Sequence, residues 1–232
     1  ASRPVIFSAH GVPKSVPEEA KLKNLSFVDA TCPLVSKVHR ESEQLNKNGF
    51  DILLIGHKNH PEVIGTMGQL PKGSIKLIET KNDVDLLKEN DFKKPIAYIT
   101  QTTLSVDDTR GLINAQQEKF PSIIGPSADD ICYATQNRQD AVKQLSLECE
   151  IVLVIGSKTS SNSNRLKELA EKCGTKSFLI DGKSDIDVEL LRKASIVGIT
   201  AGASAPEEIV QEVISFLYPL GYKTVRNLSE NN

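Results

Sequence analysis

The chain has 232 residues, of which 39% are hydrophobic and 25% charged, and its 28 basic and 30 acidic residues give a net charge of −2. This is the composition of an ordinary globular protein. A charge so close to zero gives no general attraction to nucleic acid or a membrane, and neither is predicted as a partner. No apolar run approaches the roughly 20 residues that cross a bilayer, and no signal peptide is recognisable. We therefore predict a cytoplasmic protein and leave a plastid location open.

The chain matches itself at an offset of about 100 residues. Cys32 and Cys132 each precede a glycine by 24 residues, with a helix-like stretch and then an apolar run in between. The matched pairs are residues 35–46 with 135–147, 51–56 with 151–156, 75–79 with 177–181, and 96–100 with 196–200. Self-similarity of this kind predicts repeated copies of one structural unit.

Uninterrupted Val, Ile and Leu runs are typical of parallel strands covered on both faces, so the repeat predicts α/β units with small parallel sheets. Residues 4–8 resemble the last strand of a further unit, and the chain starts at an Ala, so we expect a segment upstream of it. Three such units would form a closed, pseudo-threefold body with the cysteine-bearing ends converging on an axis. The predicted domains are residues 1–31 with the tail 216–232, residues 32–131, and residues 132–215.

Cys32 and Cys132 are predicted to be equivalent thiolate ligands of one metal centre. Each has an acidic residue three positions earlier and a helix directly after it, and a helix N-terminus stabilises a thiolate. A plain buried cysteine is the common alternative, but it does not explain why both copies keep this residue. Cys149 and Cys173 have no counterpart in the repeat and are interpreted as structural. None of the cysteines has the paired spacing of a structural zinc site.

Polar residues follow the predicted strands, and loops at the carboxyl ends of parallel strands usually form one site. His60 and Glu62 stand close together after one strand, where the imidazole could bind an anion and the carboxyl could deliver a proton. Residues 160–164 (SSNSN) precede a helix predicted to begin near Arg165. Their amides and hydroxyls suit an anion site or a plain N-cap, and Ser204 has the same two interpretations.

Seven motifs, in order, resemble the LytB/IspH family of 4-hydroxy-3-methylbut-2-enyl diphosphate reductases. They are SAHGV at 8–12, DATCP at 29–33, GHKNHPE at 56–62, QTTLSVDDT at 101–109, DDICYAT at 129–135, GSKTSSNSNR at 156–165 and TAGASAP at 200–206. The resemblance covers nearly the whole chain. It implies a pseudo-threefold trefoil of three α/β domains around a central [4Fe-4S] or [3Fe-4S] cluster. That cluster would be held by three cysteines, of which Cys32 and Cys132 are two and the third is expected upstream. An open iron would serve as Lewis acid and electron conduit.

The resemblance also implies roles for individual residues. Glu62 would supply the proton for loss of the substrate hydroxyl as water, and Thr102 would lie near that hydroxyl. The implied diphosphate-binding residues are His10, His60, Ser160, Ser161, Asn162 and Ser204. The implied products are isopentenyl and dimethylallyl diphosphate, in the non-mevalonate isoprenoid route, with electrons from a ferredoxin or flavodoxin. Because the first cluster cysteine is absent, we expect the 232-residue chain alone to lack reductase activity.

Two other functions compete with this one. A diphosphate-binding module without a cluster would be colourless and free of iron. A thiol redox switch would form a reducible disulfide between Cys32 and Cys132 and would not depend on iron. Neither function needs Glu62 beside His60 or the polar loop at 101–103, so the reductase is the favoured prediction.

Overall fold

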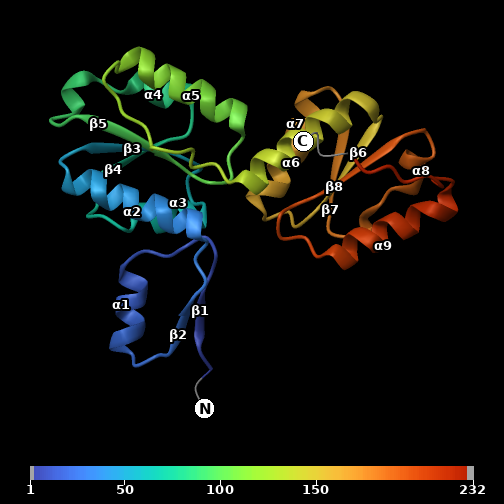
Figure 1. The fold of residues 1–232 in the computed structure, drawn as a ribbon, viewed down its shortest axis with the longest axis horizontal. Helices are drawn as coiled ribbons and strands as arrows, with labels where there is room; N and C mark the ends of the chain where they lie inside the picture. Colours follow the sequence, from blue (N-terminus) through green and yellow to red (C-terminus); the bar gives the residue numbers. More distant parts are fainter. Residues whose placement is uncertain (1–2, 229–232) are drawn as a thin grey trace. The chain divides into compact units, whose positions relative to one another are not determined.

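The computed structural model describes residues 3–228, and within that range it contains three small parallel sheets with their helices (Figure 1). The chain divides into two compact units, Ala1–Cys132 and Tyr133–Asn232. The predicted α/β class with small parallel sheets is confirmed. The three-domain division and the trefoil stay predictions, and residues 229–232 of the predicted tail lie outside the described range. Among the described helices, none combines the length and apolar character that a bilayer crossing needs.

The first unit begins with a small β-α-β element. Strand β1 (Val5–Phe7) pairs in parallel with β2 (Phe27–Asp29), and helix α1 (Ser15–Leu22) connects them. The strand expected at residues 4–8 is therefore present, whereas α1 and β2 were not predicted. The sequence could have indicated α1, because its residues include Glu, Ala, Lys and Leu, which favour helices. Strand β2 has only three residues, too few for a periodic pattern.

A three-stranded sheet in the order β4-β3-β5 forms the core of the first unit. Its elements are α2 (Pro33–Lys47), β3 (Asp51–Ile55), α3 (Pro61–Met67), β4 (Ile75–Ile78), α4 (Lys81–Leu86), β5 (Ile96–Thr100) and α5 (Val106–Lys119), with a 3-10 turn η1 (Glu89–Asp91). Side chains alternate between the two faces of a strand. Leu53 and Ile55 of β3 accordingly lie in one core cluster with residues of α4 and α5, and Ile52 and Leu54 in another with residues of α2 and α3.

The second unit repeats this plan with the sheet order β7-β6-β8. Its elements are α6 (Tyr133–Glu148), β6 (Ile151–Ile155), α7 (Ser161–Lys172), β7 (Lys176–Ile180), α8 (Val188–Leu191), β8 (Val197–Ala201) and α9 (Glu207–Leu217), with the 3-10 turns η2 (Lys183–Asp185) and η3 (Tyr218–Leu220). Leu153 and Ile155 of β6 share a core cluster with residues of α8 and α9, whereas Val152 and Val154 share one with residues of α6 and α7. Each sheet is thus covered on both faces, as its continuous apolar strands predict.

The strand register corrects one part of the repeat alignment. Asp51 pairs with Ile96 in the first unit, but its counterpart Ile151 pairs with Val197, so the last strands match at an offset of 101 rather than 100. Ile196 is 52% exposed and precedes the strand. A one-residue slip reverses which face each side chain occupies, so burial decides the register here. The shift of two between β4 and β7 is confirmed by their pairing with β3 and β6.

Candidate active site

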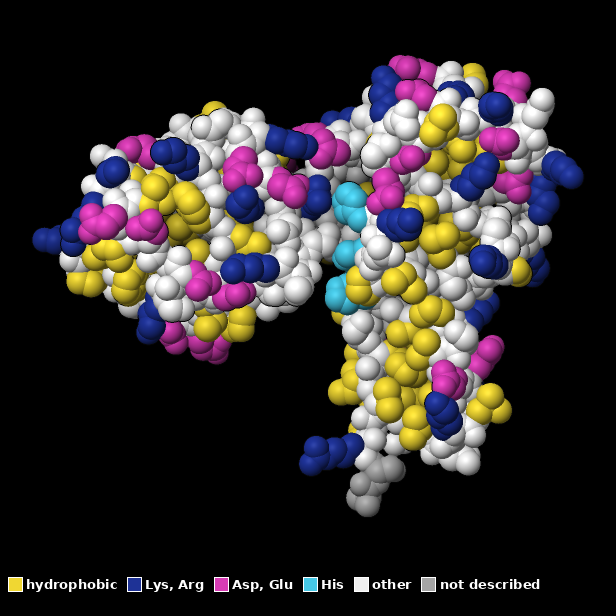
Figure 2. All heavy atoms as spheres, turned by 180° about the vertical axis from the view of Figure 1, so that it is seen from behind, with side chains coloured by type: hydrophobic (Ala, Val, Ile, Leu, Met, Phe, Trp, Pro, Cys, Tyr) yellow, Lys and Arg dark blue, Asp and Glu magenta, His cyan; other side chains and the backbone are white. Residues whose placement is uncertain are grey.

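The loop after β1 brings two predicted site histidines together. Gly11 turns the chain with φ of +74°, a conformation that favours glycine, and the side chain of Gln69 donates to the carbonyl of Val12 at 2.8 Å. These features hold the loop against α3. As a result, the rings of His10 and His60 meet edge to face with centroids 5.6 Å apart. Figure 2 shows the histidine side chains gathered in one region of the surface of this unit.

His60 is the N-cap of α3, and its Nδ1 accepts the backbone N–H of Glu62 at 3.2 Å. An Nδ1 that accepts leaves the proton of the neutral ring on Nε2. Burial, followed by the nearby His10 and His57, lowers the pKa of His60 to about 4. At neutral pH the imidazole is therefore uncharged and carries one N–H donor at Nε2.

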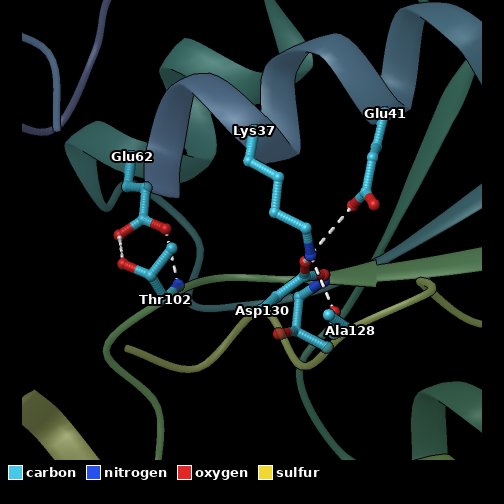
Figure 3. A network of polar contacts seen from close by, with 7 residues as sticks. Lys37, Glu41, Glu62, Thr102, Ala128 and Asp130 are labelled. Atoms are coloured by element: carbon cyan, nitrogen blue, oxygen red, sulfur yellow. Dashed lines mark hydrogen bonds and ion pairs between the residues drawn. The ribbon is translucent and has the colours of Figure 1, made fainter. Parts of the chain in front are cut away.

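Glu62 is the most deeply buried acid of this site, with 1% of its surface exposed. One carboxyl oxygen accepts the backbone N–H of Thr102 at 2.5 Å and the other accepts its hydroxyl at 3.1 Å, as Figure 3 shows. Burial raises the pKa of Glu62 to about 7, against the opposing effect of both hydrogen bonds. A carboxyl with this pKa holds a proton at neutral pH and can release it, which is the requirement for a general acid.

The two predicted cluster cysteines are anchored through their backbones to the loops that follow strands β1 and β5. The N–H of Cys132 donates to the carbonyl of Thr102 at 2.9 Å, and the N–H of Cys32 donates to the carbonyl of Ala9 at 3.0 Å. Cys32 is the N-cap of α2, ahead of Pro33, and Cys132 directly precedes α6. Both thiols are free and partly exposed. Each thiol thus stands at the start of a helix.

This donor set fits the thiolate chemistry of iron–sulfur ligation, in which each iron is held by cysteine sulfur. Residues 3–228 contain no group of three or more His, Cys, Asp or Glu side chains placed to hold a metal ion by themselves. Two thiolates would therefore need further ligands. Of the other cysteines, Cys149 is partly buried beside Gly198 at the end of α6, whereas Cys173 is exposed at the C-cap of α7.

The polar run at residues 160–164 lies inside a helix, which corrects the predicted start near Arg165. Ser160 is the N-cap, its Oγ accepts the N–H of Ser163 at 3.3 Å, and α7 begins at Ser161. Serine and asparagine compete with the backbone for hydrogen bonds and therefore look non-helical in sequence. Here they form the first turn, so Ser160 fulfils the capping role, which was the plainer of the two interpretations.

Asn162, in the same first turn of α7, is buried without a hydrogen bond from its side chain. It is 6% exposed, yet neither its Nδ2 nor its Oδ1 has a hydrogen-bond partner. A Cβ on Gly202 would lie 3.7 Å from that Nδ2, so the loop after β8 passes directly over the amide. Ser204 stands exposed on the same loop. Buried polar atoms are nearly always satisfied in native proteins, so both atoms of this amide keep the capacity for a further hydrogen bond.

The structure thus places the predicted residues in two sets. The first unit holds Cys32, Cys132, His10, His60, Glu62 and Thr102, and the second holds Ser160, Ser161, Asn162 and Ser204. Contacts join His10 to His60 and Glu62 to Thr102, with Cys132 attached to Thr102 through the backbone. In the second unit, Asn162 lies beside the loop that carries Ser204.

Comparison with known proteins identifies the family. The model of the family described as "LytB protein" matches residues 1–218. The chain belongs to the LytB family. A protein of Alcanivorax borkumensis named 4-hydroxy-3-methylbut-2-enyl diphosphate reductase is 58% identical over 220 residues, which span 94% of this chain and 70% of that protein. A protein of Saccharophagus degradans with the same name is 56% identical, with the same coverage.

Solved structures agree with this family assignment. The E-1-hydroxy-2-methyl-but-2-enyl-4-diphosphate reductase of Plasmodium falciparum is 37% identical with a TM-score of 0.89, covering 97% of this chain and 73% of that one. A structure described as (E)-4-hydroxy-3-methyl-but-2-enyl diphosphate reductase, the terminal enzyme of the non-mevalonate pathway, is 32% identical with a TM-score of 0.61, covering 93% of this chain and 76% of that one. The resemblance inferred from the motifs is therefore confirmed.

Two residues of this LytB-family site were not singled out from the sequence. Lys37 and Asp130 form an ion pair of 2.8 Å close to the predicted cluster cysteines. The acidic residue noted before Cys132 was Asp129, which is exposed, whereas the buried one is Asp130. The doubled Asp was a visible signal, but the partner Lys37 is 93 residues away, and nothing in the local pattern links the two.

Proposed function

We propose that this protein is a 4-hydroxy-3-methylbut-2-enyl diphosphate reductase, which removes the allylic hydroxyl to give isopentenyl and dimethylallyl diphosphate. The observation that carries the proposal is the buried Glu62 carboxyl, bonded to Thr102, whose carbonyl in turn anchors Cys132. A proton source and a thiolate ligand are thus joined through one residue. The relatives named for this reaction support the same conclusion.

The proposed chemistry requires two electrons and two protons, because a C–O bond breaks, water leaves and a C–H bond forms. Glu62 holds a proton at neutral pH and would deliver it to the departing hydroxyl, since burial raises its pKa to about 7. The hydroxyl of Thr102, 3.1 Å from that carboxyl, would hold the substrate hydroxyl near the acid. Loss of a neutral water would then replace loss of hydroxide.

The diphosphate would be held by neutral donors rather than by a clamp of Arg and Lys. His60 offers its Nε2 proton while uncharged, and Asn162 offers an amide that lacks a partner in the described structure. His10, Ser160, Ser161 and Ser204 are proposed for the same role. Aimed neutral donors bind an anion without placing a second buried charge in the site.

We further propose that Cys32 and Cys132 supply two thiolates to a [4Fe-4S] cluster. When bound, such a cluster with an open iron provides a Lewis acid and passes electrons to the substrate. Two features of the chain support this proposal. Each cysteine stands at the start of a helix, and the backbone N–H of each cysteine donates a hydrogen bond that fixes its position. A third ligand, the cytoplasmic location and the identity of the donor, a ferredoxin or a flavodoxin, remain predictions.

Matched cysteine variants test the proposal. In protein expressed from its whole coding sequence and reconstituted anaerobically, Cys32→Ser and Cys132→Ser should each lose cluster iron and reduction of the diphosphate substrate. Cys173→Ser, which changes an exposed thiol, should keep both. If all three variants retain iron and activity, the assignment is wrong. A colourless protein that binds the diphosphate without iron would favour the cluster-free module instead.

A further inference from the structure

One buried carboxylate connects three of the segments that carry predicted site residues of the first unit, those of Cys32, Cys132 and Thr102. Asp130 has a fully buried side chain, and Figure 3 shows it between α2 and the end of β5. Its Oδ1 accepts from Lys37 Nζ at 2.8 Å, and its Oδ2 accepts the backbone N–H of Thr100 at 2.9 Å. Both oxygens of the carboxylate are therefore used, each by a different segment.

The Lys37 ammonium extends this connection. Besides Asp130, it donates to the carbonyl of Ala128 at 2.7 Å and lies 3.4 Å from Glu41 one turn further along α2. One ammonium thus binds the loop before Cys132 at two points. Because desolvation is outweighed by Asp130 and Glu41, the pKa of Lys37 is raised, and the side chain stays charged at neutral pH.

The residues that make these contacts lie close in sequence to the two cysteines and to Thr102. Lys37 lies five residues after Cys32 on the same helix, Asp130 lies two residues before Cys132, and Thr100 lies two residues before Thr102. The three segments that present the two thiols and the partner of Glu62 are therefore joined at one carboxylate.

A partly buried ion pair of this kind, with the Asp130 side chain fully buried and 24% of the Lys37 side chain exposed, is a poor means of gaining stability. The cost of removing the Asp130 charge, and part of the Lys37 charge, from water offsets much of their attraction. An apolar pair would fill the same space at no such cost. What the charged pair adds is a fixed geometry, since its hydrogen bonds orient Lys37, Ala128, Asp130 and Thr100 relative to one another. Residues that contact the metal ligands but not the metal help to orient those ligands, and removing such residues commonly changes the metal affinity.

We propose that the Lys37–Asp130 pair is a positioning device that holds Cys32 on α2 and Cys132 on its loop in one fixed arrangement with Thr102. This inference rests on the proposed function, because it assumes that the two thiols share a cluster. Neither residue touches the substrate in this role. Both act through the cysteines and Thr102, and their effect should appear first in how the cluster is held.

The test uses anaerobically reconstituted protein and three variants of the pair. Lys37→Met keeps the aliphatic stem, Asp130→Asn keeps an acceptor for Thr100, and Lys37→Arg keeps the charge. The matched control is Lys14→Met, which breaks an exposed ion pair of 2.5 Å between Lys14, the N-cap of α1, and Glu43 of α2. Iron loss to a chelator, the electron paramagnetic resonance signal of the reduced cluster, and kcat and KM are measured for each.

Lys37→Met and Asp130→Asn should lose iron about ten- to a hundredfold faster than wild type and show an altered resonance signal. Their kcat should fall while KM for the diphosphate substrate changes by less than about twofold, because the diphosphate donors are untouched. Lys37→Arg should recover much of the wild-type behaviour, and Lys14→Met should match wild type throughout.

Hydrogen exchange of the cluster-free proteins separates the inference from a plain stabilising role. Faster exchange at residues 126–132 combined with wild-type iron loss and resonance signal would show that the pair only stabilises the loop, and would overturn the inference alone. Should Asp130→Asn fail to fold, the two Lys37 variants decide the question. A wild-type protein that holds no iron overturns the proposed function, and the positioning role with it.

Discussion

The buried Glu62 carboxyl makes the stability of the protein depend on pH in the direction opposite to that of most acids. In the unfolded chain this group ionises near 4.5, and in the folded protein near 7, because burial disfavours the carboxylate. Between these values the folded state binds more protons than the unfolded state. The free energy of unfolding contributed by Glu62 therefore falls as pH rises through this window and stays low above it.

The size of the effect follows from the two pKa values. At 1.36 kcal/mol per pH unit, the difference between 4.5 and about 7 corresponds to about 3 kcal/mol. About 2 kcal/mol of this should be lost between pH about 5 and pH about 8. Glu62→Gln removes the titrating group but keeps an oxygen for the N–H of Thr102. We therefore expect wild type to lose about 2 kcal/mol relative to this variant over the same range.

Urea unfolding of the reduced, cluster-free protein, followed by circular dichroism at several pH values, measures this difference. Glu118→Gln is the control, because it neutralises an exposed carboxylate on α5 of the same unit and should leave the pH dependence of wild type unchanged. Parallel curves for wild type and Glu62→Gln would refute the raised pKa. Activity gives a second check, since kcat of the loaded enzyme should fall as pH rises above about 7.

Three further substitutions test the local geometry. Thr102→Val deletes the hydroxyl donated at 3.1 Å to the buried carboxyl; it should raise the pKa of that carboxyl further and cost about 1 kcal/mol, as urea unfolding at neutral pH would show. Asn162→Leu replaces two buried polar atoms without partners; it should raise stability by about 1 kcal/mol while weakening calorimetric binding of inorganic diphosphate. Gly202→Ala would place a Cβ 2.2 Å from Ser163 Oγ; it should destabilise the protein by about 2 kcal/mol and lower the melting temperature. Its control is Gly111→Ala, whose Cβ would meet nothing within 4 Å and which should raise the melting temperature.

Much of the fold was predictable because its signals are local or repeated. The continuous apolar runs at β3 and β6 indicate strands covered on both faces, and the structure shows both. The ends of the last strand were harder, because Val197–Ala201 and the residues expected in its place differ by a single position. An apolar run indicates that a strand is present. Its register is decided by which side chains are buried on each face of the sheet.

The candidate site was predictable where a residue type carries its own chemistry. Glu62 and His60 could be named because a carboxyl and an imidazole after a strand suggest proton transfer and anion binding. Lys37 and Asp130 could not, because a lysine on a helix surface is usually solvated and only the folded chain shows that this one meets a buried acid. The unpartnered amide of Asn162 is likewise a property of packing around α7, which the sequence does not display.

The repeat also explains why the two copies carry different chemistry at one position. His60 and Ser160 are the N-caps of α3 and α7, so Glu62 and Asn162 both occupy the second helical position and both are buried. In the first copy, Thr102 donates two hydrogen bonds and an acid can be held there. In the second copy, the offset of 101 makes Ala203 the counterpart of Thr102, and its methyl side chain has no hydroxyl to donate, so a buried carboxylate would lack that hydrogen bond. A neutral amide can be carried at this position without such a partner. The duplicated helix start therefore holds a buried acid in one copy and a buried amide in the other, and under the proposed function that amide is an anion-binding donor.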